Sequence, residues 1–319
     1  MSARKKAVSS KKTTRQSTVH AVKRFLRQAV VSSVVAFVAA SCALHPDWRN
    51  EFKLDQLTIA QFDWEDLLPN WGWSTFTGSL PTVQGPDGVY VQTTFKQCPE
   101  FFPQGATPVV PEAPVLRELC FTDFAILHSG QRKTPVFVVE RLSAAKLKQS
   151  SQFSRTDRFY AEARLPQSER AELADYRRSG FSRGHMAPAG DMYTAQGMAQ
   201  SFSLANMVPQ DQRHNAGAWS RIENDTRKYV QRARGDVYVY TGPVYKNPVQ
   251  TIGEGRVAVP LYLYKLVYDS STGKSWVHWH ENSAQTKAGP PISYQQFVAR
   301  TGLHLLPHLS TSADAGKQG

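Results

Sequence analysis

The segment Phe181–Met192, FSRGHMAPAGDM, holds an arginine and a histidine two positions apart in a stretch interrupted by glycine and proline. Such a stretch suits neither a long helix nor an uninterrupted strand, so we expect a stiff turn. Histidine titrates near neutral pH and can accept a proton, and the arginine guanidinium matches the geometry of phosphate oxygens. Arg183 and His185 are therefore candidates for acid–base chemistry at a phosphate, although an isolated histidine on a turn is more often a surface residue.

A second group of polar residues lies on a predicted helix that begins near Asn215. At 100° per residue, the apolar side chains of NAGAWSRIENDTRKYV gather on an inward face. Asn215 lies at the centre of this face, and Glu223 and Arg227 lie on its flank, eight and twelve residues later. Buried polar groups need partners, because leaving them unpaired costs several kcal/mol. For the helix taken alone, an i, i+4 pair between Glu223 and Arg227 is the simpler explanation.

Together the two segments supply the groups that hydrolysis of a phosphodiester requires. His185 can act as the base for water, and arginines can neutralise the charge of the transition state. Mg²⁺ keeps most of its waters in proteins, so the amide oxygen of Asn215 can hold it while Glu223 binds the water ligands. The sequence therefore predicts a Mg²⁺ site, at which Mn²⁺ is an allowed substitute.

The elements that must position these residues are strands and helices in mixed order. Runs rich in Val, Phe, Tyr and Ile predict strands, and the turns GQRK and SSTGK between them favour antiparallel hairpins. A helix is predicted over 168–180, with Ser168 as its cap and Gly180 at its end. The expected fold class is α+β, with a mixed, largely antiparallel sheet core. The predicted strands cover residues 119–129, 135–142, 236–245, 257–269 and 275–282.

Five segments in order, SRGHMAPAGDM, NMVPQ, NAGAWSRIENDTR, VYTGPVY and GRVAVPLYLYKL, resemble the DNA/RNA non-specific endonuclease family of the ββα-metal (His-Me finger) nucleases. The resemblance spans roughly Leu116 to Leu306. It implies a ββα-metal catalytic motif, with His185 as general base, Asn215 as the direct Mg²⁺ ligand and Glu223 as a ligand through water.

The same resemblance implies that Arg183 and Arg227 contact the phosphate or the transition state, and that Asn206 is a supporting polar residue. A further family arginine lies upstream, and Arg155 and Arg158 are the two candidates for its position. The usual tetrad of the family is Asp-Arg-Gly-His, and here Ser182 replaces the Asp. Some members are similar in having Ser there, so the change bears on the balance between endonuclease and exonuclease action.

The expected function is that of a Mg²⁺-dependent, sugar-non-specific nuclease, which cleaves DNA and RNA to leave 5′-phosphate ends and could form a homodimer as many relatives do. One alternative is a non-catalytic nucleic-acid-binding protein of the cell envelope on a degenerate nuclease fold. Another is a nuclease toxin with a dedicated inhibitor. The intact His185 and Asn215 favour the enzyme, because a binding protein does not require them.

The formal net charge of +12 is concentrated at the N-terminus, where residues 1–28 hold nine Lys and Arg and no acid. The uncharged stretch Ala29–Leu44, AVVSSVVAFVAASCAL, is shorter than the roughly 20 residues of a spanning helix but fits the core of a signal peptide. These features predict an exported protein, which would be periplasmic, membrane-anchored or secreted. A tether through residues 25–44 or a lipidated Cys42 are the alternatives to cleavage.

Composition divides the chain into four parts. Residues 1–44 form the basic tail with the signal peptide or anchor, 45–114 an irregular aromatic and Pro-rich extension, 115–309 the nuclease domain, and 310–319 a disordered tail. Cys98 and Cys120 could form a disulfide in an oxidising compartment or remain buried thiols. His278 and His280 share a strand face, but without a third ligand they are better explained by packing.

Overall fold

Six antiparallel strands form the central sheet, in the order β13-β12-β9-β6-β5-β4. The computed structural model describes residues 80, 82–85, 88–307 and 309, which all lie within one unit, Trp73–Gly319. The expected α+β class with a largely antiparallel sheet is confirmed. The strands of the sheet are β4 (Leu116–Cys120), β5 (Phe124–Ser129), β6 (Thr134–Leu142), β9 (Val237–Val244), β12 (Tyr262–Asp269) and β13 (Lys274–Glu281).

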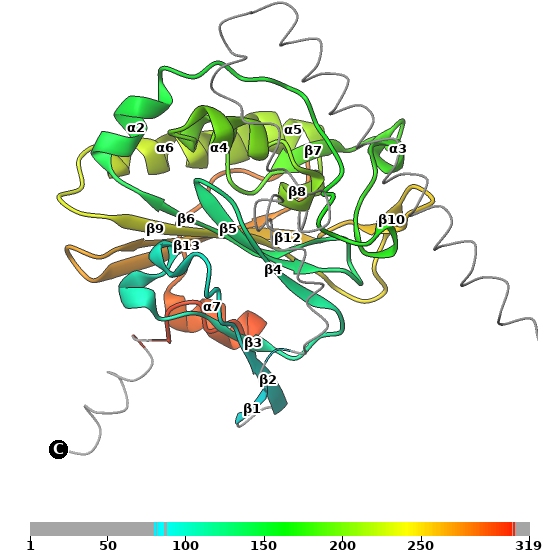
Figure 1. Cartoon of the computed structure of the whole chain (residues 1–319), viewed down its shortest axis with the longest axis horizontal. Coiled ribbons are helices and arrows are strands. Elements are labelled where there is room, and N and C mark those ends of the chain that lie inside the picture. The colour runs from blue at the N-terminus through cyan, green and yellow to red at the C-terminus, as the bar shows by residue number, and fades with distance from the viewer. Residues whose placement is uncertain (1–79, 81, 86–87, 308, 310–319) are drawn as a thin grey trace, which may run out of the picture. The chain divides into compact units, whose positions relative to one another are not determined.

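Alternate side chains of these strands point to opposite faces of the sheet, and each face carries its own apolar core. Leu127 and Val139 belong to the core that also contains Phe297 of α7 (Tyr294–Thr301). Ile126 and Val138, one residue earlier on the same strands, belong to the opposite core. In Figure 1, α7 lies below the sheet, and helices that include α2 (Ala144–Ser150), α4 (Ala195–Gln200), α5 (Gln212–His214) and α6 (Ser220–Val230) lie above it.

The described part of the expected irregular extension is more ordered than its composition predicts. β1 (Thr82–Gly85), β2 (Gly88–Gln92) and β3 (Val109–Pro111) form a three-stranded antiparallel sheet, and the short 3₁₀ turns η5 (Pro99–Phe101) and η6 (Pro103–Gly105) lie between β2 and β3. Phe95, Phe101 and Phe102 are buried in the core on the α7 side. The core therefore begins before the boundary expected at residue 115, because these aromatic side chains gain free energy by leaving water.

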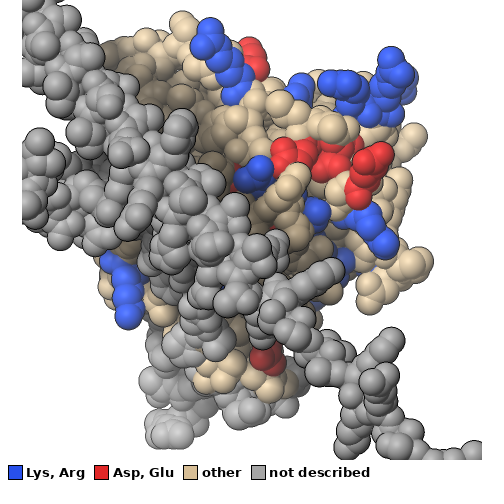
Figure 2. Space-filling view, turned by 45° about the vertical axis from the view of Figure 1, so that its right-hand side comes forward, with Lys and Arg blue, Asp and Glu red and all other residues tan. Residues whose placement is uncertain are grey.

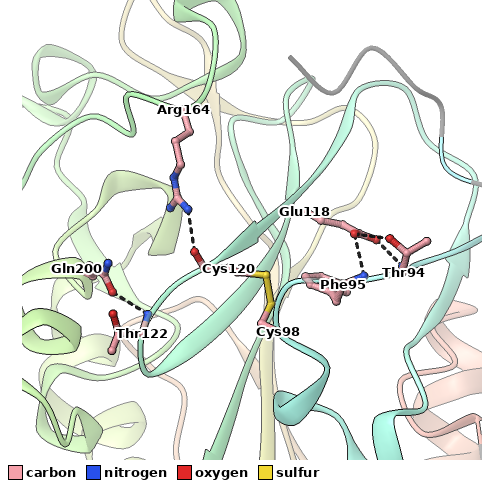
Figure 3. The surroundings of a disulfide bond; sticks show 8 residues. All are labelled: Thr94, Phe95, Cys98, Glu118, Cys120, Thr122, Arg164 and Gln200. Atoms are coloured by element: carbon pink, nitrogen blue, oxygen red, sulfur yellow. Dashed lines mark hydrogen bonds between the residues drawn. A yellow bond between two sulfur atoms is a disulfide. The ribbon is translucent and has the colours of Figure 1, made fainter. Parts of the chain in front are cut away.

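A disulfide bond between Cys98 and Cys120 fastens this segment to the edge of the sheet (Figure 3). Beside it, the carboxylate of Glu118 accepts hydrogen bonds from the backbone N–H groups of Thr94, at 2.6 Å, and Phe95, at 2.8 Å. The bond closes a loop with a sequence separation of 22 residues. It therefore restricts the unfolded chain and holds the aromatic segment against β4.

The helix expected over 168–180 is reduced to the 3₁₀ turn η7 (Gln167–Glu169) and the single helical turn α3 (Leu173–Tyr176). Asp175 explains the difference. Its Oδ1 accepts the N–H of Gly255, at 2.7 Å, and its Oδ2 accepts the N–H of Glu172, at 2.9 Å. Gly255 lies in the turn between β10 (Thr251–Ile252) and β11 (Val257–Ala258), so docking of a distant hairpin outweighs the local preference for helix.

The segment that carries Arg183 and His185 is β7 (Ser182–His185), which pairs antiparallel with β8 (Met207–Gln210). A β-carbon at Gly184 would overlap the side chain of Gln210, so only glycine fits between the arginine and the histidine. The helical segment α5–η10–α6 follows β8, with η10 (Asn215–Trp219) in π-helical form. This β7–β8–α6 order agrees with the expected ββα unit.

Candidate active site

His185 ends β7 with its ring against two phenylalanines. The ring centroid lies 5.1 Å from that of Phe202 and 5.7 Å from that of Phe159. Its Nε2 is buried and has no hydrogen-bond partner among the described residues. Burial lowers the pKa of His185 to about 3, and the positive charges of Arg155 and Arg183 contribute to this shift. The imidazole is therefore neutral at neutral pH and keeps a nitrogen lone pair that can accept a proton.

Two exposed arginines flank this histidine. The guanidinium of Arg183 lies 4.0 Å from the centroid of Phe159. Arg155 lies 5.3 Å from the centroid of Phe202 and donates to Asp157 Oδ1 at 2.9 Å. Stacking holds both guanidinium planes near His185 while leaving N–H groups for a phosphate.

Asn206 is completely buried, and the backbone engages its whole side chain. Its Oδ1 accepts the N–H of Ala187 at 2.9 Å, and its Nδ2 donates to the carbonyls of Ala187 and Ser201, each at 2.9 Å. The N–H of Met186 in turn donates to the Asn206 carbonyl at 3.0 Å. These bonds fix the chain that follows His185, so the geometry gives Asn206 a positioning role rather than contact with a substrate.

The π-helical turn η10 changes which residues of the helical segment share a face. The N–H of Ser220 donates to the carbonyl of Asn215, five residues earlier. On a continuous α-helix, the eight-residue spacing would place Glu223 about 80° from Asn215. A π-turn takes up about one extra residue, so the effective spacing is seven and the separation falls to about 20°. Arg227 aligns in the same way, and all three side chains are half-buried.

Arg227 is held by a carboxylate that the sequence motifs did not single out. Its Nη1 donates to Asp191 Oδ1 at 2.7 Å, and its Nη2 donates to Asn224 Oδ1 at 2.7 Å. Asp191 closes the 3₁₀ turn η8 (Ala189–Asp191), six residues after His185, and its side chain is only 3% exposed. The pair therefore ties the segment after β7 to α6. The Asp in FSRGHMAPAGDM was visible in the sequence, but its partner on α6 was not.

The surroundings of the Glu223 carboxylate shift its pKa. Burial raises the pKa of Glu223 to about 7, the positive charge of Lys265 opposes this shift, and the negative charge of Asp191 adds to it. Arg227 is a further positive neighbour, so the expected i, i+4 interaction is present as an electrostatic effect. A carboxylate that is costly to ionise in this place would be stabilised by an added cation.

Two buried charged residues of the sheet also face this group and were missed in the sequence. Glu140 on β6 and Lys265 on β12 are each 1% exposed. Burial, followed by the charge of Asp191, raises the pKa of Glu140 well above its usual value. The only signal in the sequence is a charged residue inside each of two apolar strands, VVERL and LYKLV. That pattern does not reveal which face of the sheet the charge occupies or what it meets.

The described residues suit a hydrated cation better than a directly coordinated one. In this part of the chain, no group of three or more His, Cys, Asp and Glu side chains is arranged to hold a metal ion. His280 Nδ1 instead lies 3.1 Å from Nε2 of the buried His214, as the packing explanation of the β13 histidines expects. Asn215 offers one amide oxygen, and Glu223 offers a half-buried carboxylate in line with it. Mg²⁺ accepts such a donor set, because it retains most of its waters.

A solved structure shares this fold. The crystal structure of the EndoG/EndoGI complex aligns with a TM-score of 0.54 at 23% identity, covering 66% of this chain and 90% of that chain.

Curated relatives include the mitochondrial nuclease EXOG of Homo sapiens, 37% identical over 159 residues, and of Danio rerio, 36% identical over 158 residues. These matches cover 46% of this chain, and 43% and 46% of the relatives. Mitochondrial endonuclease G of Bos taurus is 32% identical over 161 residues, 47% of this chain and 53% of the relative. The chain thus spans about half the length of the curated relatives that it matches.

These relatives contradict the prediction of an exported, periplasmic or secreted protein, because both the EXOG and the endonuclease G proteins are mitochondrial. The prediction failed because a basic, acid-free segment is common to the start of signal peptides and to mitochondrial transit segments. The membrane tether through residues 25–44, Cys42 and the predicted tail 310–319 lie outside the described residues. Within them, no helix is long and apolar enough to cross a membrane.

A sequence model of the DNA/RNA non-specific endonuclease family matches residues 105–300, which is more than half of the chain. The match contains the β7–β8–α6 unit and every site residue described above. The chain belongs to the DNA/RNA non-specific endonuclease family.

Proposed function

We propose that this protein is a metal-dependent nuclease that hydrolyses phosphodiester bonds of DNA and RNA and leaves 5′-phosphate ends. The proposal is carried by the alignment of Asn215, Glu223 and Arg227 by the π-turn, together with a neutral His185 flanked by arginines. Family membership supports the same reaction class.

In the proposed reaction, His185 takes the proton of the attacking water through a ring nitrogen. Arg183 and Arg155 bind the phosphate oxygens from one side, and Arg227, held by Asp191, contacts them from α6. Asn206 keeps the backbone after His185 in place.

Asn215 would hold Mg²⁺, or Mn²⁺ in its place, and Glu223 would bind the water ligands of the cation. The cation would supply Lewis-acid stabilisation of the phosphate and leaving-group oxygens. Glu223 is fitted to this task because its ionisation is costly until a positive charge arrives.

The surface charge suits a substrate that is bound at specific arginines rather than by one broad positive field. Outside the basic residues 1–28, the chain has 29 Lys and Arg against 26 Asp and Glu. On the face shown in Figure 2, both kinds of side chain lie close together. We therefore expect affinity for nucleic acid to depend on the site arginines.

The proposal is tested with the full chain on closed circular DNA, linear DNA with blocked ends, and RNA. Each substrate is incubated with Mg²⁺ and with EDTA. Mg²⁺-dependent cleavage of the circle that His185→Ala abolishes, while its far-UV circular dichroism is unchanged, is the expected result. Cleavage of free ends alone would assign exonuclease action, in line with Ser182. Binding of DNA without cleavage of any substrate would refute the enzyme and favour a nucleic-acid-binding protein.

A further inference from the structure

Glu140 of β6 is a buried carboxyl group without a hydrogen bond. It is 1% exposed, and neither Oε1 nor Oε2 has a partner among the described residues. An unpaired polar group in a protein core costs several kcal/mol, and an apolar side chain at this strand position would avoid that cost. A bound partner other than these protein groups would explain why a carboxyl group occupies this position.

The charges around Glu140 leave its carboxyl uncompensated. The groups that act on it electrostatically are Asp191 and Glu223, which are acidic, and Lys265 and Arg227, which are basic. Three carboxyl groups therefore face two cations when all are ionised.

Both cations make their hydrogen bonds elsewhere. Arg227 donates to Asp191 and Asn224, and Lys265 Nζ donates to Thr241 Oγ1 at 2.7 Å. Glu140 and Glu223 thus remain as two neighbouring carboxyl groups for which no hydrogen bond to either cation is formed.

The arrangement of the elements brings these two carboxyl groups to one place. Glu223 lies on α6, which lies above the sheet to which β6 belongs (Figure 1). Trp219, at the end of the π-turn, lies beside the Glu223 carboxyl, because its side chain acts on Glu223 as a hydrogen-bond partner that lowers the Glu223 pKa. The unpaired carboxyl group of Glu140 on β6 and the carboxyl group of Glu223 on α6 therefore border the same interior.

We propose that Glu140 is a second carboxyl group of the cation site, which binds water ligands of the divalent cation together with Glu223. This inference rests on the proposed function, since it assumes a cation held at Asn215. A hydrated Mg²⁺ offers many O–H donors and two positive charges, which match the unfilled acceptors and the excess of carboxyl groups. Carboxylates that orient a metal ion through its waters contribute to affinity without touching the metal.

The test measures Mn²⁺ binding by isothermal titration calorimetry on the full chain, without nucleic acid. Glu140→Gln keeps the shape of the side chain and removes its charge, and Glu140→Met serves as a second variant. We expect either to raise the Kd for Mn²⁺ about tenfold or more. Glu118→Gln is the matched control, because the Glu118 carboxylate accepts hydrogen bonds from Thr94 and Phe95 beside the disulfide. We expect the Kd of this variant for Mn²⁺ to stay within about twofold of the wild-type value.

The melting temperature of the metal-free protein separates a cation-binding role from a structural one. Glu140→Gln should not lower it, because the change removes an unpaired carboxyl from the core. An unchanged Kd together with a lower melting temperature would identify Glu140 as a structural counter-ion and overturn the inference. If Glu223→Gln weakens Mn²⁺ binding and neither Glu140 variant does, the inference fails while the proposed function stands. A wild type that cleaves DNA but binds no Mn²⁺ would overturn the cation site itself.

Discussion

The ion pair between Arg227 and Asp191 should couple the segment after β7 to α6 by a measurable free energy. Nη1 and Oδ1 are 2.7 Å apart, and the side chains are 22% and 3% exposed. Removing one member of a buried pair costs about 3–5 kcal/mol, because the other charge is left unpaired. Arg227 retains some contact with water, so we expect the lower end, about 3 kcal/mol, for Asp191→Asn. For a domain of this size that loss lowers the melting temperature by about 6–12 °C.

A double-mutant cycle with Asp191→Asn and Arg227→Met isolates the pair. Urea unfolding is followed by tryptophan fluorescence in EDTA, so that no cation contributes to the free energy of unfolding. We expect a coupling energy of about 2 kcal/mol. The control cycle removes Asp225 and Lys228, a pair at 3.2 Å whose side chains are 71% and 65% exposed, and should give at most about 0.5 kcal/mol. Equal coupling energies in the two cycles would refute the reasoning, since burial would then have no effect.

Three further predictions concern stability and the cation site. Replacing Cys98 and Cys120 by serine should lower the free energy of unfolding by about 3.4 kcal/mol for a separation of 22 residues, and an unchanged urea midpoint would contradict this. Burial lowers the pKa of His128 from 6.5 to about 4. The contribution of the neutral His128 to stability is therefore complete above pH 6.5 and is lost as the pH falls through 4. The melting temperature of His128→Gln should accordingly fall less over this pH range than that of the wild type. Deleting Gly217 should turn the π-turn into an α-turn and leave Asn215 in line with Glu223, because seven residues on a continuous α-helix also place them about 20° apart, so Mn²⁺ binding should be retained. Gly217→Ala, whose β-carbon would have no neighbour within 4 Å, should retain Mn²⁺ binding as well, and loss of binding in the deletion variant alone would refute the spacing argument.

Sequence patterns predicted the strands well, because their apolar runs are long and their turns distinctive. The runs expected over 236–245 and 257–269 contain the whole of β9 and of β12. The same reasoning failed for the helix over 168–180, where Asp175 is committed to the backbone of Gly255. It also treated residues 45–114 as irregular, whereas the disulfide and the burial of Phe95 join the described part to the core.

Local composition by itself determined the types of the groups at the site. Arg183 and His185 stand on either side of a glycine, and an amide, a carboxylate and a guanidinium lie on one predicted helical segment. Residue types and spacing carry this information because they fix which chemistry is available and roughly which face of an element presents it.

Only the tertiary structure decided the angular position of Asn215 around its helix and the partners of the charged residues. The π-turn places one extra residue in the helical segment, and no periodicity in the sequence reveals it. Arg227 meets Asp191, and Glu140 faces Glu223, because a hairpin, a sheet and a helix far apart in the chain pack together. The pKa values of these groups depend on desolvation and on charges that only folding brings near. The sequence therefore predicted which residues form the site, but it did not predict how they shift one another's pKa values.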